Sequence, residues 1–255
     1  MAIIAMIVSI AVLGILYKRM IDREVPDKIG TAQALVPVGL GIVSLPLSLP
    51  IVLGVAVLLT QAGYVKDAYP MWVRSLVAAF ATAGFPEELS KFLMILVSLI
   101  IFRKRIRNVY EYALIGAAVG AGFTVFEEYL YGDANLLNFL FRLLTIGLHM
   151  LFSLIMAYYL GKAKYQKKTG EGSPFVSRLL AFLIPVALHT VYDACTGLNG
   201  LLSAENDDAI LTGIIVGIGS TIVMFIVQIL LLRRFKKDAE ELSGMSLVQD
   251  EGLRG

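Results

Sequence analysis

The sequence predicts an all-α membrane protein, a polytopic transmembrane helical bundle of about seven spans with a short extra helix before the third span. Hydrophobic residues make up 58% of the 255 residues and charged residues 16%, whereas soluble domains have roughly 45–50% and about 25%. Nearly uncharged runs recur along the whole chain, and about 18 such residues suffice to cross a bilayer. These two features together indicate a lipid-embedded chain.

Seven apolar segments are expected to cross the membrane. Their bounds are 2–17, 35–60, 84–102, 111–131, 137–160, 175–197 and 209–232. They form a single predicted transmembrane domain over 1–237, followed by a polar, mobile cytoplasmic tail at 238–255. Lys18 and Arg19 follow the first apolar run instead of preceding it, which favours a retained first span over a cleaved signal peptide.

The basic residues predict the orientation of the chain, because 18 of the 22 fall on every second connection. These clusters are Lys18, Arg19, Arg23 and Lys28; Arg103, Lys104, Arg105 and Arg107; Lys162, Lys164, Lys167, Lys168 and Arg178; and Arg233, Arg234, Lys236, Lys237 and Arg254. The positive-inside rule then places the N-terminus outside the cell and the C-terminus in the cytoplasm. The clusters are topology signals beside the lipid bilayer and require no nucleic-acid partner.

Residues 71–83 have the composition of a helix but follow a connection that is expected to lie outside. Joined to the third span they would make a helix of about 48 Å, longer than the roughly 30 Å apolar core requires. Glycine permits a turn and proline suits the first position of a helix. We therefore expect a break at Gly84-Phe85-Pro86, between a short outer or re-entrant helix and the third span.

Ionisable side chains recur inside the predicted spans, where each costs roughly 2.5–3.5 kcal/mol at the membrane centre. The set is Glu87, Glu88, Lys91, Glu127, Glu128, Arg142, His149, His189 and Asp193. The direction of each span brings most of these residues to overlapping depths in the outer half of the membrane, with His149 near the middle of the fifth span. They are expected to face one another or a wet cavity.

Local spacing predicts individual contacts within this set. Glu87 and Lys91 are four residues apart and can pair on one helix face. His189 and Asp193 have the same spacing, which suits a carboxylate that orients an imidazole or two ligands of one metal. Arg142 could hold a carboxylate from a neighbouring span. Taken singly, each pair is more often a structural clasp than a catalytic device.

Four short patterns stand in order along the chain: EExxK at Glu87, Glu88 and Lys91, FxxxE ending at Glu127, a histidine at His149, and HxxxD from His189 to Asp193. This order resembles the PrsW family of intramembrane proteases, which is related to the CAAX-processing membrane proteases. The resemblance covers a catalytic core of about 70–197, and the first and seventh spans carry no motif. It implies cleavage of membrane-anchored protein substrates on the extracytoplasmic side, with anti-sigma factors among the bacterial substrates.

Peptide hydrolysis requires an activated water and stabilisation of the oxyanion. Cys195 lies beyond the cluster, so we expect Glu87 or Glu88 to be the general base. In a metal version Glu127, His149, His189 and Asp193 would bind zinc. In a metal-free version both histidines would donate to the oxyanion. The alternatives are a proton- or cation-coupled membrane transporter and a non-enzymatic sensor or scaffold.

Overall fold

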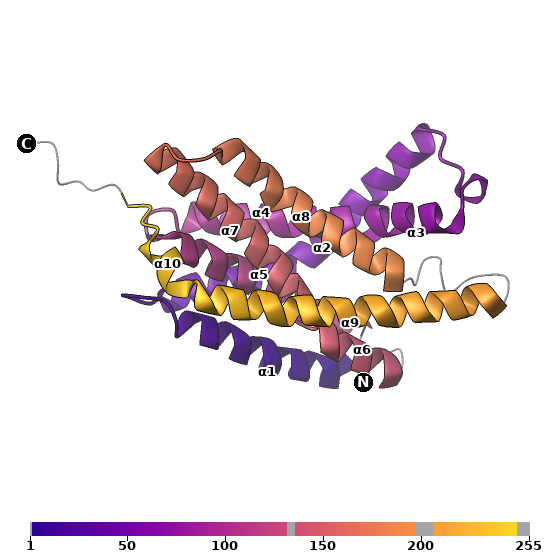
Figure 1. The fold of residues 1–255 in the computed structure, drawn as a ribbon, viewed down its shortest axis with the longest axis horizontal. Coiled ribbons are helices and arrows are strands. Elements are labelled where there is room, and N and C mark those ends of the chain that lie inside the picture. The colour runs from indigo at the N-terminus through magenta and orange to yellow at the C-terminus, as the bar shows by residue number, and fades with distance from the viewer. Residues whose placement is uncertain (1, 132–135, 197–206, 249–255) are drawn as a thin grey trace, which may run out of the picture.

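The computed structural model describes residues 2–131, 136–196 and 207–248, and this part of the chain is helical without a β-strand. Its α-helices are α1 (Ala2–Ile21), α2 (Thr31–Gln61), α3 (Met71–Ala79), α4 (Phe85–Ile101), α5 (Val109–Tyr131), α6 (Leu136–Thr145), α7 (Leu148–Thr169), α8 (Pro174–Thr196), α9 (Asp207–Lys237) and α10 (Ala239–Gly244). A 3-10 turn, η1 (Lys66–Ala68), precedes α3, and a π-helical turn, η2 (Phe80–Gly84), follows it. Figure 1 shows these helices packed into one elongated bundle.

The predicted helical membrane bundle is confirmed. Among the described residues, six helical segments are long and apolar enough to cross a bilayer, and they correspond to every predicted span except the third. The third is α4, whose 17 residues include Glu87, Glu88 and Lys91. Three prolines lie inside the 31-residue α2 without ending it, as is tolerated in membrane helices where neighbouring groups satisfy the freed backbone.

Helix α5 is the centre of the bundle, and most of its residues are buried. It packs against α1, α2, α4 and α7, and small residues allow the closest approach. A Cβ atom on Gly120 would lie 2.2 Å from the backbone oxygen of His149. Glycine at this position therefore lets α5 and α7 meet backbone to backbone beside His149.

The connections that carry the basic clusters lie together at one end of the bundle. Arg107 pairs with Asp27 at 3.1 Å, and the Leu247 N–H donates to the Arg107 carbonyl. Lys168 donates to the carbonyls of Ser246 and Val248. Figure 1 shows α10 at this end and the start of α1 at the opposite end. The connections that carry basic clusters in the sequence thus meet at one end of the structure.

The expected short helix before the third span is present as α3, but the expected break at Gly84-Phe85-Pro86 is wrong, because the chain stays helical from α3 through η2 into α4. Gly84 has ordinary helical angles of φ −51° and ψ −46°, so it makes no turn. It serves a close contact instead, since a Cβ atom there would lie 2.1 Å from Thr190 Oγ1 on α8. The π-helical turn η2 lies immediately before α4 and ends at this contact.

Two other expectations differ from the structure. The predicted fifth span is divided into α6 and α7 by Ile146 and Gly147. The start of the predicted mobile tail is the ordered helix α10, which buries Leu242 in the main core together with Leu247 just beyond it. Most of the predicted outer connections 132–136 and 198–208, like residues 249–255, lie outside the described residues.

Candidate functional site

The first turns of α4 supply three charged side chains to the interior of the bundle. Lys91 and Glu88 are fully buried, and their ion pair joins Lys91 Nζ to Glu88 Oε1 at 2.5 Å. This pair spans three residues, so the expected pairing of Lys91 with Glu87 is replaced by one with Glu88. Glu87 lies on the same helix with 15% of its side chain exposed. A charge pair this deeply buried requires further polar partners around it.

The C-terminal part of α5 holds two glutamates that share one arginine. Arg142 on α6 contacts Glu127 Oε1 at 3.1 Å and Glu128 Oε1 at 2.8 Å. Its Nε also donates to Glu128 Oε1 at 2.9 Å. The expectation that Arg142 holds a carboxylate of a neighbouring span is confirmed, and it holds two of them. Glu128 is thus engaged by the arginine, while Glu127 keeps its second oxygen for another partner.

His149, the second residue of α7, connects these two groups. Lys91 Nζ lies 2.9 Å from its Nδ1, and its Nε2 lies 2.8 Å from Glu127 Oε2. An ammonium group has only donors, so Nδ1 accepts and Nε2 carries the hydrogen. Phe123 packs on the imidazole with ring centroids 4.8 Å apart, and Lys91 Nζ lies 4.2 Å from the centre of the same phenyl ring.

His189 on α8 lies between carboxylates. Its Nδ1 is 2.7 Å from Glu88 Oε1, and its Nε2 is 3.3 Å from Asp193 Oδ2 and 3.9 Å from Glu87 Oε2. Ionised carboxylate oxygens only accept, so beside ionised partners the imidazole is either doubly protonated or gives Nε2 to a cation. The centroids of the two imidazole rings are 5.0 Å apart.

The predicted convergence of the polar residues is therefore confirmed. Side chains from four long helices and from α6 meet in one buried cluster: Glu87, Glu88, Lys91, Glu127, Glu128, Arg142, His149, His189 and Asp193. All of them lie in the half of the bundle away from the basic connections, since they belong to the start of α4 and α7, to the end of α5 and α8, and, for Arg142, to α6. His149 therefore begins a helix at this depth, whereas it was expected near the middle of a span.

Two buried carboxylate oxygens in this cluster, Glu87 Oε2 and Glu88 Oε2, have no hydrogen-bond partner within the described residues. Within the part of the chain that the structure describes, five carboxylates here face only Lys91 and Arg142 as permanent cations. This leaves an excess of three negative charges when both histidines are neutral. Buried charge of this kind is costly without compensation. Protonated histidines or a bound divalent cation would offset it.

A metal ion fits part of this arrangement. Ligand atoms of Glu87, His149 and His189 lie within 4.8 Å of one another. His189 has the hydrogen bond from Nδ1 to a carboxylate that is typical of metal-bound histidines, and Glu87 Oε2 is free. His149 would join only if the Lys91 ammonium released its Nδ1. The predicted ligand set contained Glu127 and Asp193 in place of Glu87. In the structure Glu127 contacts His149 and Asp193 contacts His189.

Known proteins resemble the chain over most of this region. The family described as PrsW family intramembrane metalloprotease matches residues 36–232. The protein named Protease PrsW from Halalkalibacterium halodurans is 29% identical over 143 residues, which cover 54% of the chain and 62% of the relative. Protease PrsW from Geobacillus kaustophilus is 32% identical over 132 residues, which cover 51% and 56%. The chain thus matches about three fifths of the length of these relatives. No solved structure matches it.

Proposed function

The chain belongs to the PrsW family of intramembrane metalloproteases, and on that premise we propose that it hydrolyses peptide bonds of membrane-anchored proteins near the extracytoplasmic face. The observation that carries the proposal is the pair of unpartnered, buried carboxylate oxygens of Glu87 and Glu88 beside two histidines. An oxygen without a partner is free to accept a proton from water. Family membership favours this reaction over the transporter and the scaffold.

Glu88 is the proposed general base. Lys91 Nζ and His189 Nδ1 both contact its Oε1, which fixes the carboxylate and leaves Oε2 as the oxygen that accepts the proton of the attacking water. The proton then passes to the leaving amine. Its neighbour Glu87 approaches the other nitrogen of the same imidazole, because Glu87 Oε2 faces His189 Nε2 while Glu88 contacts Nδ1.

Zinc is the proposed cofactor, held by Glu87, His149 and His189. When bound, such an ion supplies polarisation of the water and of the scissile carbonyl. Glu88 orients His189 through Nδ1, and Glu127 lies 2.8 Å from His149 Nε2. Arg142 holds Glu127 in turn. In the absence of a metal, His149 Nε2 and His189 Nε2 would be the donors nearest to a developing oxyanion.

Single-span membrane proteins, anti-sigma factors among them, are the proposed substrates. The PrsW resemblance supports this substrate class, and the basic clusters support extracytoplasmic cleavage, because they lie at the end of the bundle away from the site. A substrate anchored by one helix can bring its outer juxtamembrane segment to this depth. The proposal therefore places the cut close to the outer membrane surface.

The test uses the purified full chain in detergent with a single-span reporter substrate, and it measures cleavage and bound metal together. Glu88→Gln should abolish cleavage but retain the metal, because an amide cannot accept the proton. His189→Ala should lose both. Glu111→Gln is the matched control, since Glu111 is an equally buried carboxylate at the opposite end of the bundle. Wild-type cleavage by the Glu87→Gln/Glu88→Gln double variant would refute the glutamate mechanism, and full activity after exhaustive chelation would refute the zinc proposal.

A further inference from the structure

The break between α6 and α7 exposes backbone groups that a continuous helix would pair. Gly147 has φ −91° and ψ 0° and precedes the first residue of α7. The break frees the Gly147 N–H and the Leu144 carbonyl from the regular helical pattern. Within the membrane no water satisfies such groups, so leaving one unpaired is costly. A partner must come from another helix.

That partner is Gln228 of α9. The Gly147 N–H donates to Gln228 Oε1 at 3.0 Å, and Gln228 Nε2 donates to the Leu144 carbonyl at 3.3 Å. An uncharged amide offers both the acceptor and the donor that this break requires. Gln228 is 6% exposed, and a Cβ atom on Gly147 would lie 2.9 Å from its Oε1. Glycine at 147 thus leaves room for the amide.

The break lies between two residues that contact the same carboxylate. Arg142, before it, contacts Glu127 Oε1 at 3.1 Å, and His149, after it, contacts Glu127 Oε2 at 2.8 Å. The angle between α6 and α7 therefore decides whether both side chains reach Glu127 together. Nothing in the sequence pattern of α9 indicated a part in the site, because its charged residues lie only near its ends.

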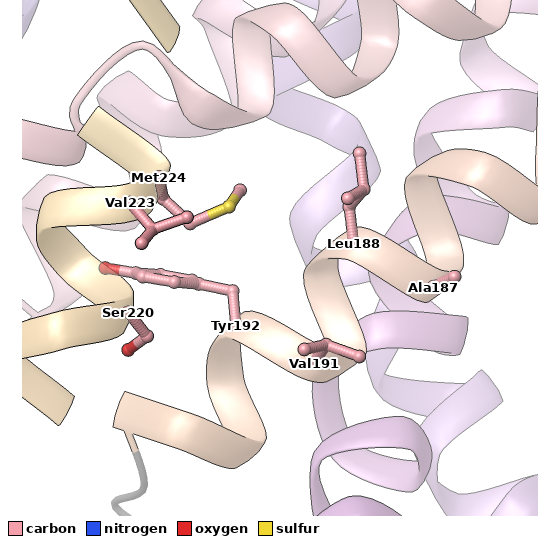
Figure 2. Close-up of a pocket in the computed structure, with 7 residues that line it drawn as sticks. All are labelled: Ala187, Leu188, Val191, Tyr192, Ser220, Val223 and Met224. Atoms are coloured by element: carbon pink, nitrogen blue, oxygen red, sulfur yellow. The ribbon is translucent and has the colours of Figure 1, made fainter. Parts of the chain in front are cut away.

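The rest of α9 packs more loosely beside the site. An apolar cavity of about 230 Å³ separates α9 from α8, lined by Ala187, Leu188, Val191, Tyr192, Ser220, Val223 and Met224. Figure 2 shows the Tyr192 ring reaching from α8 toward Val223 on α9. Apolar contacts across a cavity fix a helix position weakly. The two hydrogen bonds of Gln228 link α9 directly to the backbone of the break, and Tyr192 adds a hydrogen bond from α8 to Thr145 at the end of α6.

We infer that Gln228 is a positioning residue for the proposed hydrolysis: by pairing both backbone groups of the α6–α7 break, it places Arg142 and His149 on Glu127. This inference rests on the proposed function. Gln228 touches neither substrate nor metal and acts through the orientation of His149. Its loss should therefore lower kcat more than it raises KM.

The experiment compares Gln228→Leu with Gln33→Leu in the purified full chain. Gln33 is a matched control, because it is also a buried glutamine (7% exposed) and bonds a backbone carbonyl at the opposite end of the bundle. Gln228→Leu should lower kcat about 10- to 100-fold, the usual range for groups that orient metal or catalytic ligands. Gln33→Leu should leave kcat unchanged. Amide hydrogen exchange across residues 144–149 should become faster only in Gln228→Leu, a readout that requires no catalysis.

Gln228→Glu adds a pH signature. A carboxylate accepts from the Gly147 N–H but cannot donate to Leu144, whereas the protonated acid does both. The activity of Gln228→Glu relative to the unmodified chain should therefore rise as the pH falls. This variant also carries the test if Gln228→Leu does not fold.

Three outcomes would overturn the inference: a kcat of Gln228→Leu equal to that of the unmodified chain, an equal loss in Gln33→Leu, or unchanged hydrogen exchange at 144–149. If the unmodified chain cleaves and Gln228→Leu cleaves equally well, the inference fails and the proposed function stands. If neither cleaves any single-span substrate, the proposed function fails, and the positioning role in hydrolysis fails with it. Faster hydrogen exchange in Gln228→Leu would then support only the two hydrogen bonds between Gln228 and the α6–α7 break.

Discussion

Lys91 is a fully buried lysine that joins the two halves of the site. Its ammonium contacts Glu88 Oε1 at 2.5 Å and His149 Nδ1 at 2.9 Å, and it lies 4.2 Å from the centre of the Phe123 ring. Each contact belongs to a different part of the cluster: α4 itself, the start of α7 and the middle of α5. The single ammonium group of the lysine therefore sets the tautomer of His149 and also neutralises the Glu88 carboxylate.

Lys91→Met should destabilise the fold, because it leaves Glu88 as a buried charge without its cation. Removing one partner of a buried ion pair costs about 3–5 kcal/mol. The double variant Lys91→Met/Glu88→Gln should recover part of this loss, since residue 88 then carries no charge that lacks its cation. Thermal unfolding in detergent measures both. Lys18→Met is the control, because the Lys18–Asp22 pair is exposed and should contribute little. A double variant less stable than Lys91→Met would contradict this account.

At the scale of elements, the sequence predicted which helices exist better than how they join. Charge and hydropathy located the spans, because burying a charged residue in lipid is costly at any position. The joins depend on packing between helices that no local pattern records. Gly84 resembled a helix breaker but is a contact with Thr190, and the break at Gly147 depends on Gln228, 81 residues further along the chain. For the same reason the pairing of Lys91 with Glu88 instead of Glu87 could not be predicted.

The connection between α1 and α2 is held to the start of α5 by a buried acidic group. Glu24 is 1% exposed; its Oε2 accepts from the Ile29 N–H at 2.6 Å, and its Oε1 lies 3.6 Å from Arg107. Arg107 also pairs with the buried Glu111. Burial, together with the nearby Glu111 carboxylate, raises the pKa of Glu24 to about 7. The connection thus contains a carboxyl group that is protonated in the folded state at pH values where the unfolded chain is ionised.

This raised pKa predicts that stability falls as the pH rises. The folded state binds the Glu24 proton more tightly than the unfolded state, so its contribution is complete below about pH 4.5 and lost as the pH rises to about 7. The full change is at most about 3 kcal/mol, because the neighbouring Glu111 carboxylate contributes to the same shift. Glu24→Gln should remove this dependence, because an amide is neutral throughout. Unfolding midpoints at pH 5 and pH 8 measure it, with the exposed Asp22→Asn as control. A steeper pH dependence in Glu24→Gln would be the opposite of this prediction.

For the whole molecule, the two ends of the bundle differ in charge and in chemistry. Connections rich in lysine and arginine lie together at the end that holds α10, and the polar cluster lies in the other half. The sequence predicted this separation because both features follow from the direction of each span. The arrangement of the helices alone does not define which end of the bundle faces the cytoplasm. The positive-inside rule assigns it, because connections rich in lysine and arginine stay on the cytoplasmic side.

The orientation predicts that residue 66 is reachable from outside the cell and residue 104 is not. Lys66 and Lys104 are both exposed, one in η1 and one in the connection after α4. Each is changed to cysteine in a Cys195→Ser background, because Cys195 is the lone native cysteine; the predicted outer residue Ser203 lies outside the described residues. An impermeant thiol reagent should label Lys66→Cys in intact cells and Lys104→Cys only after lysis. The reverse pattern would put the polar cluster on the cytoplasmic side. The proposed extracytoplasmic cut would then be wrong, while hydrolysis at the same side chains would remain open to the cleavage assay.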